Sequence, residues 1–139
     1  MIRCLTLTVS MLAAAVTALG AGPATAQPTT EPAPEPSCVY TLSEPSLVSV
    51  SGVLMVTASL APFPCTGSIN PNSMTVCVSP KGDAGNGKCG FASRSIPAQV
   101  FLTPYRPGTT YESTGRGCGG VYTLVGAICA TVGPKTATL

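Results

Sequence analysis

The stretch LVSVSGVLMVTASL, residues 47–60, decides the fold class that we expect for this chain. Before Ser51 and Gly52 the valines alternate with serines, and after them every second position is apolar, at Leu54, Val56, Ala58 and Leu60. This period of two is typical of a strand with one buried face. Ser-Gly between two such runs is a turn signal. The stretch therefore predicts two antiparallel strands joined as a hairpin.

Runs of similar character recur along the chain. We expect further strands at 38–42, 74–79, 89–93, 98–103, 110–114 and 121–132, the last with a bend at Gly126. Segments rich in proline, glycine or asparagine separate the runs at intervals of roughly ten residues, and we expect loops there; they are 61–67, 69–73, 79–88, 95–97, 104–108 and 115–120. No window after residue 26 has the period of an amphipathic helix. Seven or eight short strands predict an all-β fold, an immunoglobulin-like antiparallel β-sandwich.

The first 26 residues have the features of a secretory signal peptide. Arg3 stands near the start, an apolar run begins at residue 5, and small residues at 24 and 26 form an A-x-A exit. A membrane anchor is the alternative, but the run is short for a span of about 20 residues and no basic cluster follows it. We expect cleavage after Ala26 and a secreted protein, extracellular or in the cell wall, with no transmembrane segment.

Residues 27–37, QPTTEPAPEPS, contain four prolines and no large apolar residue. Such a segment predicts an extended polyproline II spacer, and a frayed terminus is the alternative interpretation. The domain should begin at Cys38 and run over 38–139, about 100 residues, which is enough for one sandwich.

Six cysteines fall within this domain, and an even number in a small exported chain is typical of a disulfide framework. They are Cys38, Cys65, Cys77, Cys89, Cys118 and Cys129. Six cysteines allow 15 pairings; we favour the sequence neighbours, 38 with 65, 77 with 89 and 118 with 129. A zinc site is the rival interpretation, but it needs closer cysteine pairs or histidines, and the chain has no His. We therefore expect no metal.

Charge is sparse and spread along the domain. The cations are Lys81, Lys88, Arg94, Arg106, Arg116 and Lys135, and the anions are Glu44, Asp83 and Glu112. No basic cluster or stripe forms in the sequence, so nucleic acid is not an expected partner.

Catalytic groups are equally sparse. The absence of His removes the commonest general base. Hydrolysis by paired carboxylates would have to use Glu44, Asp83 and Glu112, and nothing in the sequence marks these as partners. We therefore expect that the protein is not an enzyme, and a hydrolase that uses carboxylate residues is an alternative.

The motif GRGCGG, residues 115–120, has the glycine spacing of a dinucleotide-binding turn. Such a turn opens a helix and has an acidic residue about 20 positions further on. Here a strand-like run follows, and no acidic residue comes after Gly120. We expect no cofactor, and instead a tight loop whose glycines adopt positive φ, held by Cys118.

The most informative polar stretch is CVSPKGDAGNGKC, residues 77–89. A bond between its two cysteines would clamp a hairpin at its neck and contribute on the order of 3 kcal/mol. A loop ordered in this way loses less entropy on binding. We treat Lys81, Asp83, Asn86 and Lys88 as a candidate recognition loop; the alternative is a connection that binds nothing.

The segment YRPGTTY, residues 105–111, resembles the tyrosine corner of fibronectin type III and related immunoglobulin-like domains. Tyr105 stands where that family usually has Leu, and the core tryptophan of the family is missing. The resemblance implies a sandwich in which the Tyr111 hydroxyl bonds back to the backbone, and it says nothing about a ligand.

Two looser resemblances concern function. The stretch TVCVSPKGDAGNGKC is similar in character to secreted subtilisin inhibitors of filamentous soil bacteria, which makes a protease inhibitor an alternative. The overall composition resembles small exported proteins of mycobacteria and their relatives, in which Ala, Pro, Thr and Gly are abundant and Lys is sparse. Our main hypothesis is a non-catalytic module that binds a protein or cell-envelope component.

Overall fold

The computed structural model describes residues 33–122 and 125–139, which form eight strands and one 3-10 turn. The predicted signal peptide and most of the proline-rich segment lie outside these residues. The elements are β1 (Ser37–Leu42), β2 (Ser46–Val50), β3 (Val53–Thr66), β4 (Ile69–Pro80), η1 (Ala84–Asn86), β5 (Lys88–Ser93), β6 (Ala98–Leu102), β7 (Thr110–Val121) and β8 (Ala127–Thr138).

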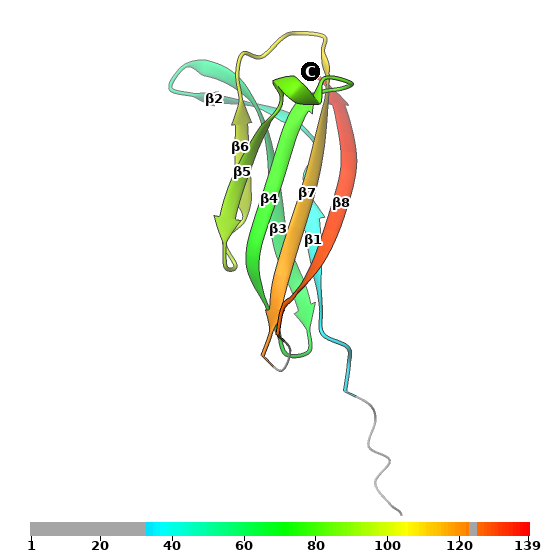
Figure 1. Ribbon diagram of the computed structural model, residues 1–139. Helices are drawn as coiled ribbons and strands as arrows, with labels where there is room; N and C mark the ends of the chain where they lie inside the picture. Colours follow the sequence, from blue (N-terminus) through cyan, green and yellow to red (C-terminus); the bar gives the residue numbers. More distant parts are fainter. Residues whose placement is uncertain (1–32, 123–124) are drawn as a thin grey trace, which may run out of the picture. The chain divides into compact units, whose positions relative to one another are not determined.

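The strands form two antiparallel sheets packed face to face (Figure 1). In sheet A, β3 pairs with β1 and β2 along one edge and with β6 along the other. Sheet B has the order β5-β4-β7-β8. The prediction of an all-β fold, an antiparallel sandwich with disulfides, is confirmed.

The hairpin predicted from residues 47–60 is present. Val50 pairs with Val53, so Ser51 and Gly52 form a two-residue turn, and both have positive φ, 51° and 81°. This is the turn geometry that matches the right-handed twist of paired strands.

The predicted loops at 61–67 and 69–73 are wrong, because β3 extends to Thr66 and β4 begins at Ile69. Pro62 and Pro64 lie in a part of β3 that pairs with β1 alone, since β6 pairs only with residues 56–60. Pro71 lies before the point where β5 joins β4, next to a shift in the β4–β7 register. Proline lacks a backbone donor and is tolerated in a strand that has one free edge, so these prolines do not end the strands.

The core lies between the two sheets and follows the period of two. Val56, Ala58 and Leu60 of β3 face Met74, Val76 and Val78 of β4, and all six are buried. Full burial of one such aliphatic side chain contributes about 1.5–3 kcal/mol. Tyr111, at the start of β7, is 1% exposed. Its hydroxyl accepts a hydrogen bond of 2.9 Å from the Arg106 N–H, across the turn that precedes the strand.

GRGCGG does not form the tight loop that we expected. Residues 110–121 are one continuous strand, and none of the glycines at 115, 117, 119 or 120 has a positive φ. Gly117 lies under the ring of Tyr40, and a Cβ there would overlap that ring. Gly115 and Gly119 make similarly close contacts with Leu60 and Ile69. The alternate glycines therefore let large side chains reach β7.

The strand boundaries that we predicted on either side of this motif are also wrong. We expected separate strands at 110–114 and 121–132, whereas β7 ends at Val121 and β8 runs from Ala127 to Thr138. The connection between β7 and β8 falls in the first half of the strand expected at 121–132. Because the chain continues into an antiparallel strand, the strand–turn–helix arrangement of a dinucleotide-binding turn does not form at residues 115–120.

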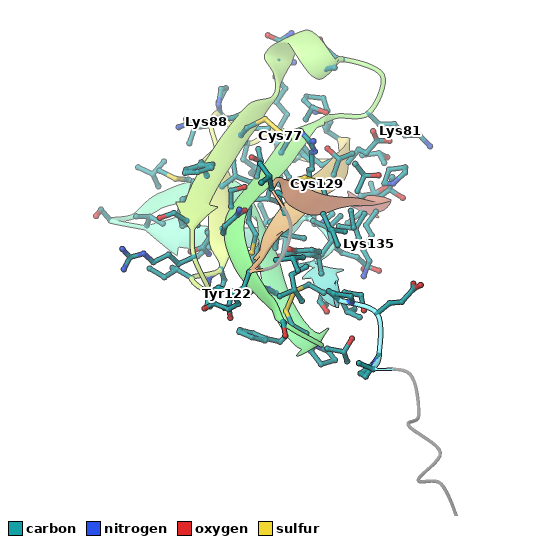
Figure 2. All side chains as sticks on the ribbon, turned by 60° about the horizontal axis from the view of Figure 1, so that its bottom comes forward. Cys77, Lys81, Lys88, Tyr122, Cys129 and Lys135 are labelled. Atoms are coloured by element: carbon teal, nitrogen blue, oxygen red, sulfur yellow. A yellow bond between two sulfur atoms is a disulfide. The ribbon has the colours of Figure 1, made fainter. Side chains whose placement is uncertain are left out.

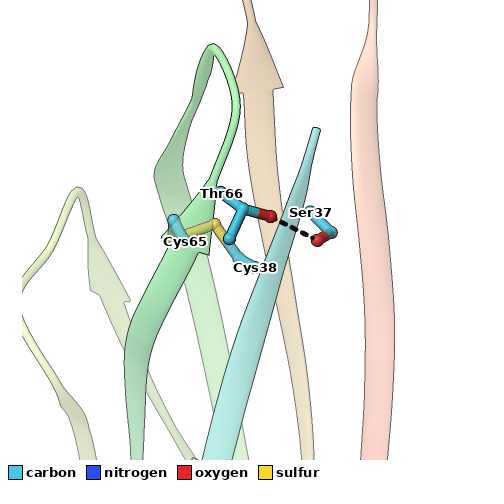
Figure 3. Close-up of a disulfide and its surroundings, with 4 residues drawn as sticks. All are labelled: Ser37, Cys38, Cys65 and Thr66. Carbon is cyan, nitrogen blue, oxygen red and sulfur yellow. Dashed lines mark hydrogen bonds between the residues drawn. A yellow bond between two sulfur atoms is a disulfide. The ribbon is translucent and has the colours of Figure 1, made fainter. Parts of the chain in front are cut away.

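The six domain cysteines pair as sequence neighbours, and each bond joins residues directly opposite each other on adjacent strands. Cys38–Cys65 links β1 to β3, and beside it the Ser37 and Thr66 hydroxyls lie 2.9 Å apart (Figure 3). Cys77–Cys89 links β4 to β5, and Cys118–Cys129 links β7 to β8. Each bond thus stiffens one sheet.

Candidate binding face

The outer face of sheet B, which points away from the core, carries polar side chains in cross-strand rows. On β7 the buried residues alternate with Glu112, Thr114, Arg116 and Cys118. The register aligns Phe91, Thr75, Arg116 and Thr131 across all four strands. Phe91 is 69% exposed on this face. The face therefore combines an aromatic ring, a guanidinium group and several hydroxyls.

Two of the three disulfides stiffen this outer face. Cys77 occupies an outward position on β4, between the buried Val76 and Val78, and Cys118 does so on β7, between the buried Gly117 and Gly119. Their partners, Cys89 and Cys129, are exposed on the two edge strands of the sheet. Each edge strand is therefore covalently tied to the central strand beside it.

The register between β7 and β8 shifts near Thr114, and a hollow in the outer face of sheet B lies beside this shift. Ser113 pairs with Lys135 and Gly115 with Val132, so Thr114 alone faces Gly133 and Pro134. Gly133 has φ 97°, and a Cβ there would crowd Leu42 and the Ser113 carbonyl. Bulges of this kind bend the strand that carries them. A hollow of about 280 Å³ opens beside the bulge, with Arg116 and Thr131 in its lining.

A second hollow, of about 350 Å³, adjoins the first and lies under the β4–β5 loop. The two hollows share Cys77 and Thr114. Lys88 and Glu112 both line the second hollow, so it carries one group of each charge. Its volume is within the range of small-ligand sites.

The structure divides the predicted recognition loop into two pairs of residues. Asp83 and Asn86 bond to each other, because the Asn86 side-chain N–H donates to the Asp83 carboxylate at 2.6 Å and the Asn86 backbone N–H donates to the Asp83 carbonyl at 3.2 Å. These two residues thus hold the loop closed around η1. Lys81 and Lys88 are exposed and lie on opposite sides of the loop (Figure 2).

The loop is compact. The Lys81 N–H donates to the Thr110 carbonyl at 2.9 Å, and a Cβ on Gly87 would lie 2.8 Å from the Ser79 Cβ. The backbone between the two lysines therefore folds back on itself and onto β4. The loop is exposed, but the 3-10 turn at Ala84–Asn86 differs from the extended segment that a protease would cleave.

The three carboxylates considered for hydrolysis lie on different elements. Glu44 is in the β1–β2 connection of sheet A, Asp83 is bonded within the β4–β5 loop, and Glu112 points outward from β7. Within residues 33–122 and 125–139, no three acidic, histidine or cysteine side chains are grouped so that they could hold a metal ion. In the same part of the chain, no helix has the length and hydrophobicity needed to cross a membrane.

Sequence reasoning missed most of the outer face. It identified Lys88 but not Thr114, Arg116 or the row that contains Phe91, because residues 115–120 were expected to form a loop. Within GRGCGG, the period of two in Gly115, Gly117 and Gly119 is the signal that could have revealed a strand whose other side faces solvent.

Comparisons with protein-family models, with curated proteins and with solved structures each give no match.

Proposed function

We propose that this chain is an exported, non-catalytic module that binds a protein or cell-envelope component through the outer face of sheet B. The observation that carries the proposal is the coincidence on one face of two disulfides and two adjoining hollows, which share Cys77 and Thr114. A surface held rigid before binding loses less entropy when it meets a partner. Arg116, Phe91 and the threonines supply the mixture of charge, aromatic surface and hydroxyls that recognition surfaces use.

Export is part of this proposal. Three disulfides are typical of proteins that fold in oxidising compartments, outside the bacterial or eukaryotic cytoplasm. The features of residues 1–26 point the same way. Mass spectrometry of the protein from the culture medium or cell wall should find a chain that begins at Gln27, and a chain that retained residues 1–26 would contradict this part.

We also propose that the sandwich belongs with immunoglobulin-like modules related to fibronectin type III domains. Two observations support this: the Tyr111 hydroxyl bonds to the backbone of Arg106, five residues upstream, and β1, β3 and β6 lie in one sheet while β4, β7 and β8 lie in the other. Modules of this class present binding surfaces on a stable scaffold.

Binding can be tested with envelope fragments of the parent cell. The wild-type protein should sediment with the fragments, and Arg116→Glu, which reverses a charge at the centre of the face, should lower the bound fraction about tenfold. Val39→Glu is the control, since it adds a negative charge at a residue that is 56% exposed on β1 of the other sheet. Equal retention of all three proteins would exclude the outer face of sheet B as the binding surface.

The two alternatives have separate tests. A protease inhibitor should reduce the activity of secreted serine proteases stoichiometrically, whereas the closed shape of the β4–β5 loop favours no inhibition. A carboxylate hydrolase should lose its activity when Glu112 is changed to Gln. Turnover of any substrate by the purified protein would contradict the binding module.

A further inference from the structure

β2 is an outer strand of sheet A, and one of its two edges is free. β2 pairs with β3 on one side, and its substantial contacts are with β3 alone. Because Val50 and Val53 flank a two-residue turn, their backbone groups bond to each other. Backbone groups alternate in direction along an antiparallel strand, so the N–H and C=O groups of Leu47 and Ser49 point to the free edge.

The other strand edges of the described chain are covered or interrupted. β5 lies beside β6, with Gly90 against the backbone of Gln99, and β1 lies beside β8. β8 also carries Pro134, Lys135 and the bulge. Such devices prevent strands from pairing with other chains. Among the outer strands that the structure describes, β2 therefore has the edge that is left open for pairing.

The β2–β3 hairpin is also apolar and extends beyond the pairing with β6, which stops at Val56 (Figure 1). No charged residue occurs between Glu44 and Lys81. Four of its large apolar side chains are exposed by 38–51%; they are Leu47, Val50, Val53 and Leu54. Exposed apolar surface next to unpaired backbone groups is typical of a site where another strand adds to a sheet.

We infer that this edge pairs with the same edge of a second copy of the chain, antiparallel and about a two-fold axis at Val48. In this register, Leu47 of each copy exchanges hydrogen bonds with Ser49 of the other, so all four edge groups of each strand are paired. Val48 would face its symmetry mate. On the outer face of sheet A, Val48 is next to Met55, so an apolar row would run unbroken across both copies.

Backbone chemistry favours a strand over a lipid surface at this edge. A lipid surface would accept the apolar side chains but would leave the Leu47 and Ser49 backbone groups unpaired, at a cost of several kcal/mol each in hydrocarbon. An identical strand satisfies all of them, and an isologous dimer closes without leaving a free edge between the copies. The inference does not depend on the proposed function, because it concerns the other sheet.

Analytical ultracentrifugation of protein recovered from an oxidising compartment tests the inference. The wild type should sediment as a concentration-dependent dimer. Val48→Lys and Val48→Glu should each raise the dimer dissociation constant about tenfold or more, because like charges would meet at the two-fold axis. An equimolar mixture of the two variants should form a heterodimer, because opposite charges then face each other. Val39→Lys adds the same charge elsewhere on sheet A and should leave the dimer intact.

Several outcomes would overturn the inference. They are a wild type that stays monomeric at all concentrations, a Val48→Lys variant that still dimerises, or a mixture that stays monomeric. A monomer that binds phosphatidylglycerol vesicles would assign the hairpin to lipid instead. Should both Val48 variants fail to fold, Ser49→Pro removes one N–H at the free edge and leaves the bonds to β3, and an unchanged dimer in that variant would be equally decisive.

Discussion

The buried hydroxyl of Tyr40 gives the sharpest stability prediction. Tyr40 is 6% exposed, and its hydroxyl has no hydrogen-bond partner among the described residues. A buried polar group without a partner costs about 1–3 kcal/mol. Tyr40→Phe removes this group and keeps the ring that packs on Gly117. We therefore expect Tyr40→Phe to stabilise the fold by about 1 kcal/mol or more, although most substitutions of buried residues destabilise.

Thermal unfolding followed by circular dichroism measures this effect. A gain of 1 kcal/mol corresponds to a rise in Tm of about 4–8 °C for a domain of this size. Tyr111→Phe is the matched control, because it removes the same atom from a buried ring whose hydroxyl accepts a 2.9 Å hydrogen bond from the Arg106 N–H. That variant should lose about 1 kcal/mol. A Tyr40→Phe variant less stable than the wild type would refute the reasoning, since it would show that the hydroxyl is hydrogen-bonded, for instance to a water molecule.

Three further predictions concern the pKa of Tyr40, the contact of Tyr40 with Gly117, and the Cys77–Cys89 bond. Burial raises the pKa of Tyr40 above its ordinary value of 10.0. Tyr40 therefore ionises first in the unfolded chain, and the free energy of unfolding falls above about pH 10. In urea titrations, the difference in stability between Tyr40→Phe and the wild type should be constant below that pH and should widen above it. Gly117→Ala should unfold the protein, as judged by circular dichroism, because the new Cβ would overlap the Tyr40 ring. Adding Tyr40→Ala to this variant should restore part of the lost stability. A double variant that stays unfolded would contradict the contact. Replacing Cys77 and Cys89 by Ala should cost about 3 kcal/mol in urea unfolding, since the bond closes a loop of 12 residues, and a cost below about 1 kcal/mol would contradict that reasoning.

The sequence was sufficient for the fold class because the period of two dominates its most apolar stretches. The hairpin at Ser51 and Gly52 follows from local spacing. Spacing did not choose among the 15 possible cysteine pairings, and the neighbour pairs that we favoured are the ones the structure contains. The sequence could not show that β3 and β4 continue through their prolines. A strand tolerates Pro62 or Pro71 only where one of its edges has no neighbouring strand to pair with, which depends on the assembled sheet.

The outer face was hidden from sequence analysis for a related reason. A glycine-rich segment indicates a turn when read locally, and only the packing of Tyr40, Leu60 and Ile69 shows why β7 needs glycine at alternate positions. Once the inward side of β7 is identified, Thr114, Arg116 and Cys118 must point outward. The predicted loop residues were partly informative, since Lys88 lines the second hollow while Asp83 and Asn86 hold the loop closed.

The placement of the disulfides connects stability with the proposed binding. Each bond joins two strands of one sheet, so cohesion between the sheets depends on the apolar core. In sheet B, both edge strands are tied to the centre, which restrains bending about the two hollows. Sheet A has one bond, at the β1 end of β3, and the β2 hairpin at its other end carries none. The chain thus combines a covalently braced face, where we propose binding, with a hairpin that carries no disulfide and has unpaired backbone groups at its edge.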